Sequence, residues 1–151
     1  SKLMGESLCH AAHCPERPVR VVRLSNVVGG DLSSDNFIYA LLREALASGQ
    51  ILLNSSLDSA KDYIVLADVI RMLEQIARDG QARCYNLASG QQLQNRDIIK
   101  FIANITGARV NISRLAEDIC FPPINIDRIK KEFNFLPQPP LDGLHALQLT
   151  K

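Results

Sequence analysis

The stretch of residues 19–30 constrains the fold of this chain more than any other part. It consists of VRVVRLSNVVGG, a short apolar and β-branched run followed directly by polar residues and glycines. This pattern is typical of a parallel strand buried on both faces, and it predicts a strand over residues 19–26. In an open α/β sheet, ligands bind beyond the carboxyl ends of the strands. We therefore expect a binding site near the point where the apolar run gives way to Ser25 and Asn26.

The rest of the chain alternates between helical and extended patterns. Apolar residues at helical spacing, together with Asn, Asp, Gly and Pro at the expected ends, predict helices over residues 1–14, 37–47, 68–79, 95–105, 126–133 and 141–149. Short apolar runs predict strands over residues 51–53, 62–66 and 83–87, and an extended segment over 110–113. We expect Asp68 to cap its helix. Strands that alternate with helices indicate an α/β fold.

Composition excludes several classes of protein. A net charge of +1 gives no electrostatic basis for binding nucleic acid or an anionic membrane. No apolar run approaches the roughly 20 residues of a membrane span. The four cysteines contain no C-x-x-C pair, which favours reduced thiols and a cytoplasmic location.

The cysteines and histidines of residues 9–14 invite a metal interpretation, because the segment has the sequence CHAAHC. On a helix, Cys9 neighbours His13 and His10 neighbours Cys14, and these pairs point in different directions. Structural zinc normally takes its ligands from two separated pairs. We therefore expect no metal here and interpret the segment as a helix face.

Three motifs occur in a fixed order: Ser1-Lys2 at a helix start, RLSNVVG from Arg23, and KDYIVLADV from Lys61. This order resembles the extended short-chain dehydrogenase/reductase family, in particular its NAD-dependent nucleotide-sugar epimerases and dehydratases. The resemblance implies a Rossmann-like NAD(P)-binding fold. It covers only the second half of such an enzyme, because the chain contains no G-x-G-x-x-G turn.

The resemblance also places the chain within the enzyme. Lys2 matches the Lys of the family's catalytic Tyr-x-x-x-Lys motif, so the Tyr would precede residue 1. We accordingly expect residues 1–30 to be the end of the Rossmann-like domain, with one or two sheet strands. Residues 31–151 would form the smaller α/β substrate lobe.

The resemblance further implies roles for four residues near the predicted strand. Lys2 would lower the pKa of the catalytic Tyr through its positive charge, and it would bind the cofactor ribose. The backbone at Leu24 and Ser25 would lie near the nicotinamide amide. Asn26, whose carboxamide both donates and accepts hydrogen bonds, would contact the diphosphate-sugar substrate.

Three more residues match the family's substrate-binding positions. Asn36 and Phe37 correspond to an Asn-Leu pair whose amide touches the nucleotide sugar, although Asn36 could equally be a simple helix cap. Lys61 stands where the family has a phosphate-binding Arg, and it lacks the two parallel donors of a guanidinium. The family's second phosphate-binding Arg is also missing, because this chain has Phe121-Pro122-Pro123 in that region.

Two functions follow from these observations. In the first, the intact protein transfers hydride between NAD or NADP and a nucleotide-linked sugar, and the chain alone is inactive. In the second, the chain is a non-catalytic module that kept the fold for binding or regulation, as the missing phosphate arginines would allow. In either case, an unpaired edge of the strand at 19–26 and a bare first helix favour a homodimer.

Overall fold

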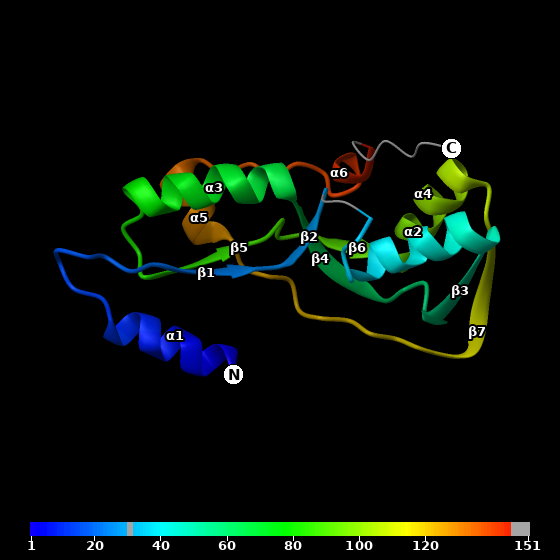
Figure 1. Ribbon diagram of the computed structural model, residues 1–151, viewed down its shortest axis with the longest axis horizontal. Helices are drawn as coiled ribbons and strands as arrows, with labels where there is room; N and C mark the ends of the chain where they lie inside the picture. Colours follow the sequence, from blue (N-terminus) through cyan, green and yellow to red (C-terminus); the bar gives the residue numbers. More distant parts are fainter. Residues whose placement is uncertain (30–31, 146–151) are drawn as a thin grey trace.

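A computed structural model describes residues 1–29 and 32–145 (Figure 1). Its helices are α1 Lys2–Ala11, α2 Phe37–Ser48, α3 Leu66–Asp79, α4 Asn95–Thr106, α5 Asp127–Phe133 and α6 Asp142–His145. Its strands are β1 Val21–Leu24, β2 Asn26–Val28, β3 Gln50–Ser55, β4 Ala60–Val65, β5 Cys84–Leu87, β6 Gln92–Gln94 and β7 Arg109–Glu117. The alternation confirms the α/β class. The helix expected over residues 141–149 lies partly outside the described residues.

The strands form three small groups. β1 pairs with β5 and β3 pairs with β7, both in parallel. β4 lies between β2, which is parallel to it, and β6, which is antiparallel. Parallel strands joined through helices are the arrangement that an alternating α/β sequence predicts.

The prediction of one strand over residues 19–26, buried on both faces, was wrong. The strand is interrupted at Ser25. The segment before it, β1, pairs with β5, and the segment after it, β2, pairs with β4. Leu24 is 48% exposed, because the described residues give β1 only one neighbouring strand. The switch of partner at Ser25 is what opens space beside the strand.

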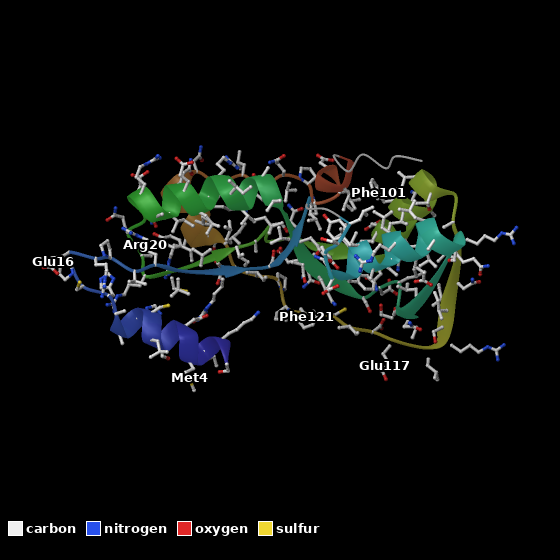
Figure 2. All side chains as sticks on the ribbon, in the orientation of Figure 1. Met4, Glu16, Arg20, Phe101, Glu117 and Phe121 are labelled. Carbon is white, nitrogen blue, oxygen red and sulfur yellow. The ribbon has the colours of Figure 1, made fainter. Side chains whose placement is uncertain are left out.

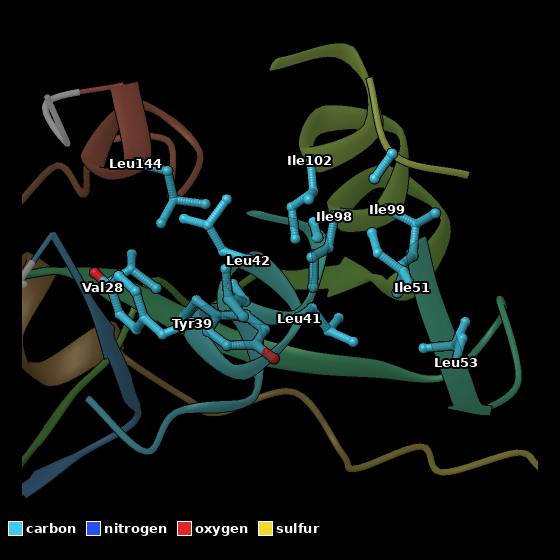
Figure 3. Close-up of a cluster of buried hydrophobic side chains, with 14 of the residues drawn as sticks. Val28, Tyr39, Leu41, Leu42, Ile51, Leu53, Ile98, Ile99, Ile102 and Leu144 are labelled. Atoms are coloured by element: carbon cyan, nitrogen blue, oxygen red, sulfur yellow. The ribbon is translucent and has the colours of Figure 1, made fainter. Parts of the chain in front are cut away.

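Two hydrophobic clusters form the core. The α2–α4 cluster, shown in Figure 3, comprises Val28, Ile38, Tyr39, Leu41, Leu42, Ala45, Ile51, Leu53, Tyr63, Val65, Ile98, Ile99, Ile102, Ala108 and Leu144. The α3–α5 cluster comprises Ile64, Val69, Met72, Ile76, Tyr85, Leu87, Ala88, Ile126, Ile129 and Phe135. Strand β4 supplies both, because its successive side chains point to opposite faces. The strand is therefore fixed from both sides.

Helix α1 is attached differently from the others. It lies on one side of β1, while α3 and α5 lie on the other side (Figure 1). None of its residues is buried. Its main link to the sheet is a two-pronged ion pair, in which Arg23 Nε and Nη2 donate to the carboxylate of Glu6 at 2.9 and 2.6 Å. The hydrogen bond from Arg23 lowers the pKa of Glu6 below its usual value.

Candidate functional site

A cavity of about 570 Å³ opens beside the strand break. We call it the Ser25 cavity, and its lining residues are Lys2, Leu24, Ser25, Asn26, Lys61, Asp62, Phe121, Pro122 and Ile124. Its volume is within the range of small-molecule sites. Five of the seven residues predicted from the sequence line it. Asn36 and Phe37 do not, although the Phe37 ring lies next to Lys61.

Ser25 occupies the floor of this cavity at the break between β1 and β2. Its backbone N–H donates to Leu87 O at 3.2 Å, which continues the β1–β5 pairing by one residue. Its hydroxyl oxygen is buried and has no hydrogen-bond partner within the described part of the chain. Buried hydroxyl groups are normally paired. The Ser25 hydroxyl is therefore an exception among the described residues.

Asn26 and Asp62 join β2 to β4 and to the turn after β5. Asn26 Nδ2 donates to the Asp62 backbone oxygen at 2.9 Å. The Asp62 carboxylate is 5% exposed and accepts from the backbone N–H groups of Ser89 and Gly90, at 2.9 and 2.7 Å. Sequence reasoning treated Asp62 only as part of a motif. The available signal was a carboxylate in an otherwise apolar strand, which requires specific partners when buried.

Lys61 presents its ammonium group to two aromatic rings. The Nζ atom lies 5.5 Å from the centroid of the Phe37 ring and 5.9 Å from that of Phe121. No ion pair to Lys61 occurs within residues 1–29 and 32–145, and the neighbouring Asp62 carboxylate is used by the turn at Ser89. Among the residues that the structure describes, the Lys61 ammonium therefore has no carboxylate partner in an ion pair. Phe121 belongs to the extended segment after β7 (Figure 2).

Lys2 is the first residue of α1 and lines the cavity. Because α1 buries no residue, the Glu6–Arg23 ion pair has a large share in placing Lys2 there. None of the three tyrosines of the chain lines the cavity. Burial raises the pKa of Tyr63 to about 12, so this tyrosine cannot serve as a base near neutral pH.

Asn36 serves as a helix cap and as a link between elements. Its Oδ1 accepts from Ile38 N at 3.1 Å, and its Nδ2 donates to Val27 O at 3.0 Å. The first of these bonds is the one that the capping alternative predicts, and the second links Asn36 to β2. They also fix the position of Phe37, the first residue of α2.

The expectation that Asp68 caps α3 was wrong. The residue at the cap position is Val65, and Asp68 lies in the first turn with its side chain fully buried. Its carboxylate pairs with Arg71 and accepts from both the backbone and the side chain of Gln138. Asp68 therefore ties the C-terminal segment to α3.

Two further observations concern metal binding and membrane spans. Within residues 1–29 and 32–145, no three His, Cys, Asp or Glu side chains are grouped to hold a metal ion. In the same part of the chain, no helix has the length and apolar character needed to cross a membrane.

Parallel strands, covering helices and a cavity beside a strand break are features of an open α/β fold. The family model of the NAD dependent epimerase/dehydratase family matches residues 1–88, and the chain belongs to that family. This confirms the resemblance seen in the sequence. A comparison with curated proteins gave no match.

Solved structures share the fold. RMD from Pseudomonas aeruginosa, complexed with NADPH, has a TM-score of 0.80 at 24% identity, over 96% of this chain and 51% of that one. A dTDP-glucose 4,6-dehydratase from Bacillus anthracis, in complex with NAD, has a TM-score of 0.74 at 17% identity, over 96% and 47%. The dTDP-glucose 4,6-dehydratase DesIV from Streptomyces venezuelae, with NAD and TYD bound, has 0.75 at 22%, again over 96% and 47%. The chain thus spans about half the length of these structures.

Proposed function

We propose that the intact protein transfers hydride between NAD or NADP and a sugar during epimerisation, dehydration or reduction. A nucleotide-linked sugar is the first substrate to test. The observation that carries this proposal is the gathering of Lys2, Leu24, Ser25, Asn26 and Lys61 in one cavity. Family membership and the NAD, NADPH and TYD named for the solved structures support it. Such an enzyme would work in the cytoplasm, as a homodimer.

Each residue has a definite task in this proposal. Lys2 holds a positive charge beside the phenol of a catalytic Tyr supplied from outside this chain, which favours the phenolate, and its remaining donors bind a ribose. Lys2, Leu24 and Ser25 would hold the nicotinamide cofactor, which would supply the acceptor or donor of the hydride. The backbone at Leu24 and Ser25 would lie near the nicotinamide amide. Asn26 and Lys61 bind the substrate from the β4 side.

The test is Lys2→Ala in the intact protein, with hydride transfer followed by the absorbance of the reduced nicotinamide. Loss of proton-transfer assistance should lower turnover about a hundredfold or more. The pH optimum should rise, because the Tyr would lose its favourable charge. Stability in urea should change little, because Lys2 is exposed. The control is Lys100→Ala, an exposed lysine on α4. Unchanged turnover at neutral pH would remove Lys2 from the mechanism.

We also infer that the 151-residue chain alone neither binds NAD tightly nor turns over substrate. It has no glycine-rich turn for the pyrophosphate, and no tyrosine lines its cavity. Calorimetry with NAD checks this, and micromolar binding would contradict it.

A second candidate function is a non-catalytic binding or regulatory module. It is favoured by the apolar Phe121 and Pro122 in the cavity wall, where the resemblance leads us to expect an arginine nearby. The two functions differ in hydride transfer by the intact protein: a module would bind ligand without any nicotinamide turnover.

A further inference from the structure

The two rings around Lys61 come from different parts of the chain. Phe37 opens α2, and Phe121 follows β7. An ammonium within about 6 Å of a ring centroid is attracted by the negative face of the ring. Lys61 satisfies this criterion twice, at 5.5 and 5.9 Å. A flexible four-carbon side chain is thereby held at a defined place on the cavity wall.

The backbone that carries each ring is held by bonds that do not involve Lys61. Asn36 caps α2 immediately before Phe37. The segment that carries Phe121 is bonded to β4 and to the loop before it, through Ala60 N to Ile119 O at 3.1 Å and Ile119 N to Ser59 Oγ at 2.8 Å. The side-chain amide of Gln92 also donates to the Phe121 backbone oxygen. The backbone at both rings is therefore placed independently of Lys61.

The charged residues that line the cavity are two lysines, Lys2 and Lys61, and one carboxylate, Asp62. Lys61 has no ion pair among the described residues, and the Asp62 carboxylate is occupied by Ser89 and Gly90. Aromatic rings hold an ammonium without neutralising it, whereas a carboxylate partner would compete with a ligand. The arrangement leaves the full positive charge available to an anionic group in the cavity.

We propose that Phe37 and Phe121 are positioning residues that hold the Lys61 ammonium as the phosphate receptor of the Ser25 cavity. This inference rests on the proposed function and deepens it. It explains how a lysine, which is a point charge on a flexible stem, serves where a guanidinium fork would be rigid by itself. It also changes the expected role of Phe37 from substrate contact to support of Lys61.

The test uses the intact protein, with uridine diphosphate as the charged probe and uridine as the uncharged one. Replacing one ring, in Phe121→Leu or Phe37→Leu, should weaken uridine diphosphate binding about fivefold, and Lys61→Met should weaken it further. Uridine binding should stay unchanged in all three variants. Phe121→Tyr, which keeps the aromatic face, should bind like the wild type. Ile119→Ala is the matched control, because it alters the same segment outside the cavity and leaves its backbone bonds in place.

Two further readouts separate positioning from general damage. In steady-state kinetics, Phe121→Leu should raise KM for a phosphate-bearing substrate and leave kcat unchanged. In NMR spectra of the dimethylated protein, ring currents should shift the Lys61 signal upfield of that of exposed Lys100, and Phe121→Leu should reduce this shift.

Several outcomes would overturn the inference: no binding of uridine diphosphate by the wild type, unchanged binding in Lys61→Met, or equal losses for uridine and uridine diphosphate in Phe121→Leu. A large effect of Lys2→Ala on hydride transfer together with any of these would leave the proposed function standing and remove only the phosphate receptor. The reverse pattern would remove the function and keep the receptor.

Discussion

The Asp62 carboxylate offers the sharpest test of how this site is built. It is 5% exposed and accepts two backbone hydrogen bonds, from Ser89 N at 2.9 Å and from Gly90 N at 2.7 Å. Ser89 is itself 3% exposed, so water cannot easily replace the lost acceptor. Asp62→Ala removes both bonds and leaves both N–H groups without a partner.

The expected cost follows from these two groups. A buried donor left unpaired costs about 1–3 kcal/mol, so the two donors released by Asp62→Ala should lower the free energy of unfolding by about 2–6 kcal/mol. Asp62→Asn keeps one acceptor oxygen but turns an NH₂ group toward the other N–H, and about 1–3 kcal/mol is expected. Against a total stability of about 5–15 kcal/mol for a single domain, the alanine variant would be marginal.

Urea unfolding followed by circular dichroism measures these values. Asp58→Asn is the matched control, because the Asp58 side chain is 61% exposed and pairs only with Arg96 in the ion pairs described. An exposed ion pair is worth at most about 1 kcal/mol, so this variant should stay near the wild type. If Asp62→Ala lost no more than Asp58→Asn, the carboxylate would not be the link between β4 and the turn at Ser89.

Three other predictions concern protonation and association. The hydrogen bond from Arg23 lowers the pKa of Glu6, so this contact stabilises α1 above the pKa of Glu6 in the unfolded state and is lost as the pH falls through its pKa in the folded state. Hydrogen exchange of the α1 amides should therefore become faster in acid. Glu6→Gln should show the same increase at neutral pH. Burial raises the pKa of Tyr63 to about 12, so its contribution to folding stability is present below about pH 10 and is lost as the pH rises toward 12. Over that interval, Tyr63→Phe should lose less stability than the wild type in urea titrations. The chain should form a dimer through the bare face of α1, where Leu8 is 67% exposed, and Leu8→Glu should weaken the dimer in light scattering; a monomeric wild type at high concentration would contradict this.

Much of the secondary structure was predictable from local sequence. The ends of α2 and α4 were expected at Gly49 and Gly107, and both glycines adopt the left-handed conformation that closes a helix. A helix over residues 68–79 was also expected, and α3 covers Leu66–Asp79. Caps and periodicity are properties of neighbouring residues, so sequence patterns report them directly.

The errors occurred where a distant part of the chain decided the outcome. The run over residues 19–26 has the composition of one strand. In the structure its first part pairs with β5 and its last residue begins the pairing with β4, so the strand is interrupted at Ser25. Asp68 is a residue type that often caps helices. In the structure its carboxylate instead accepts hydrogen bonds from Gln138, which lies 70 residues further along the chain. Strand β6 was not expected at all, because three residues, Gln92–Gln94, carry almost no periodic signal.

The sequence by itself determined the α/β class, the family resemblance and the residue types available for a site, among them Lys2, Asn26 and Lys61. These depend on local patterns and on the order of motifs. Only the tertiary structure decided that Phe121 lies against Lys61 and that Asp62 holds the turn at Ser89. Both contacts join residues far apart in the chain, and which of them meet depends on strand pairing and on how the segment after β7 returns to β4. No local pattern encodes that path, because it results from burying both faces of β4 at once.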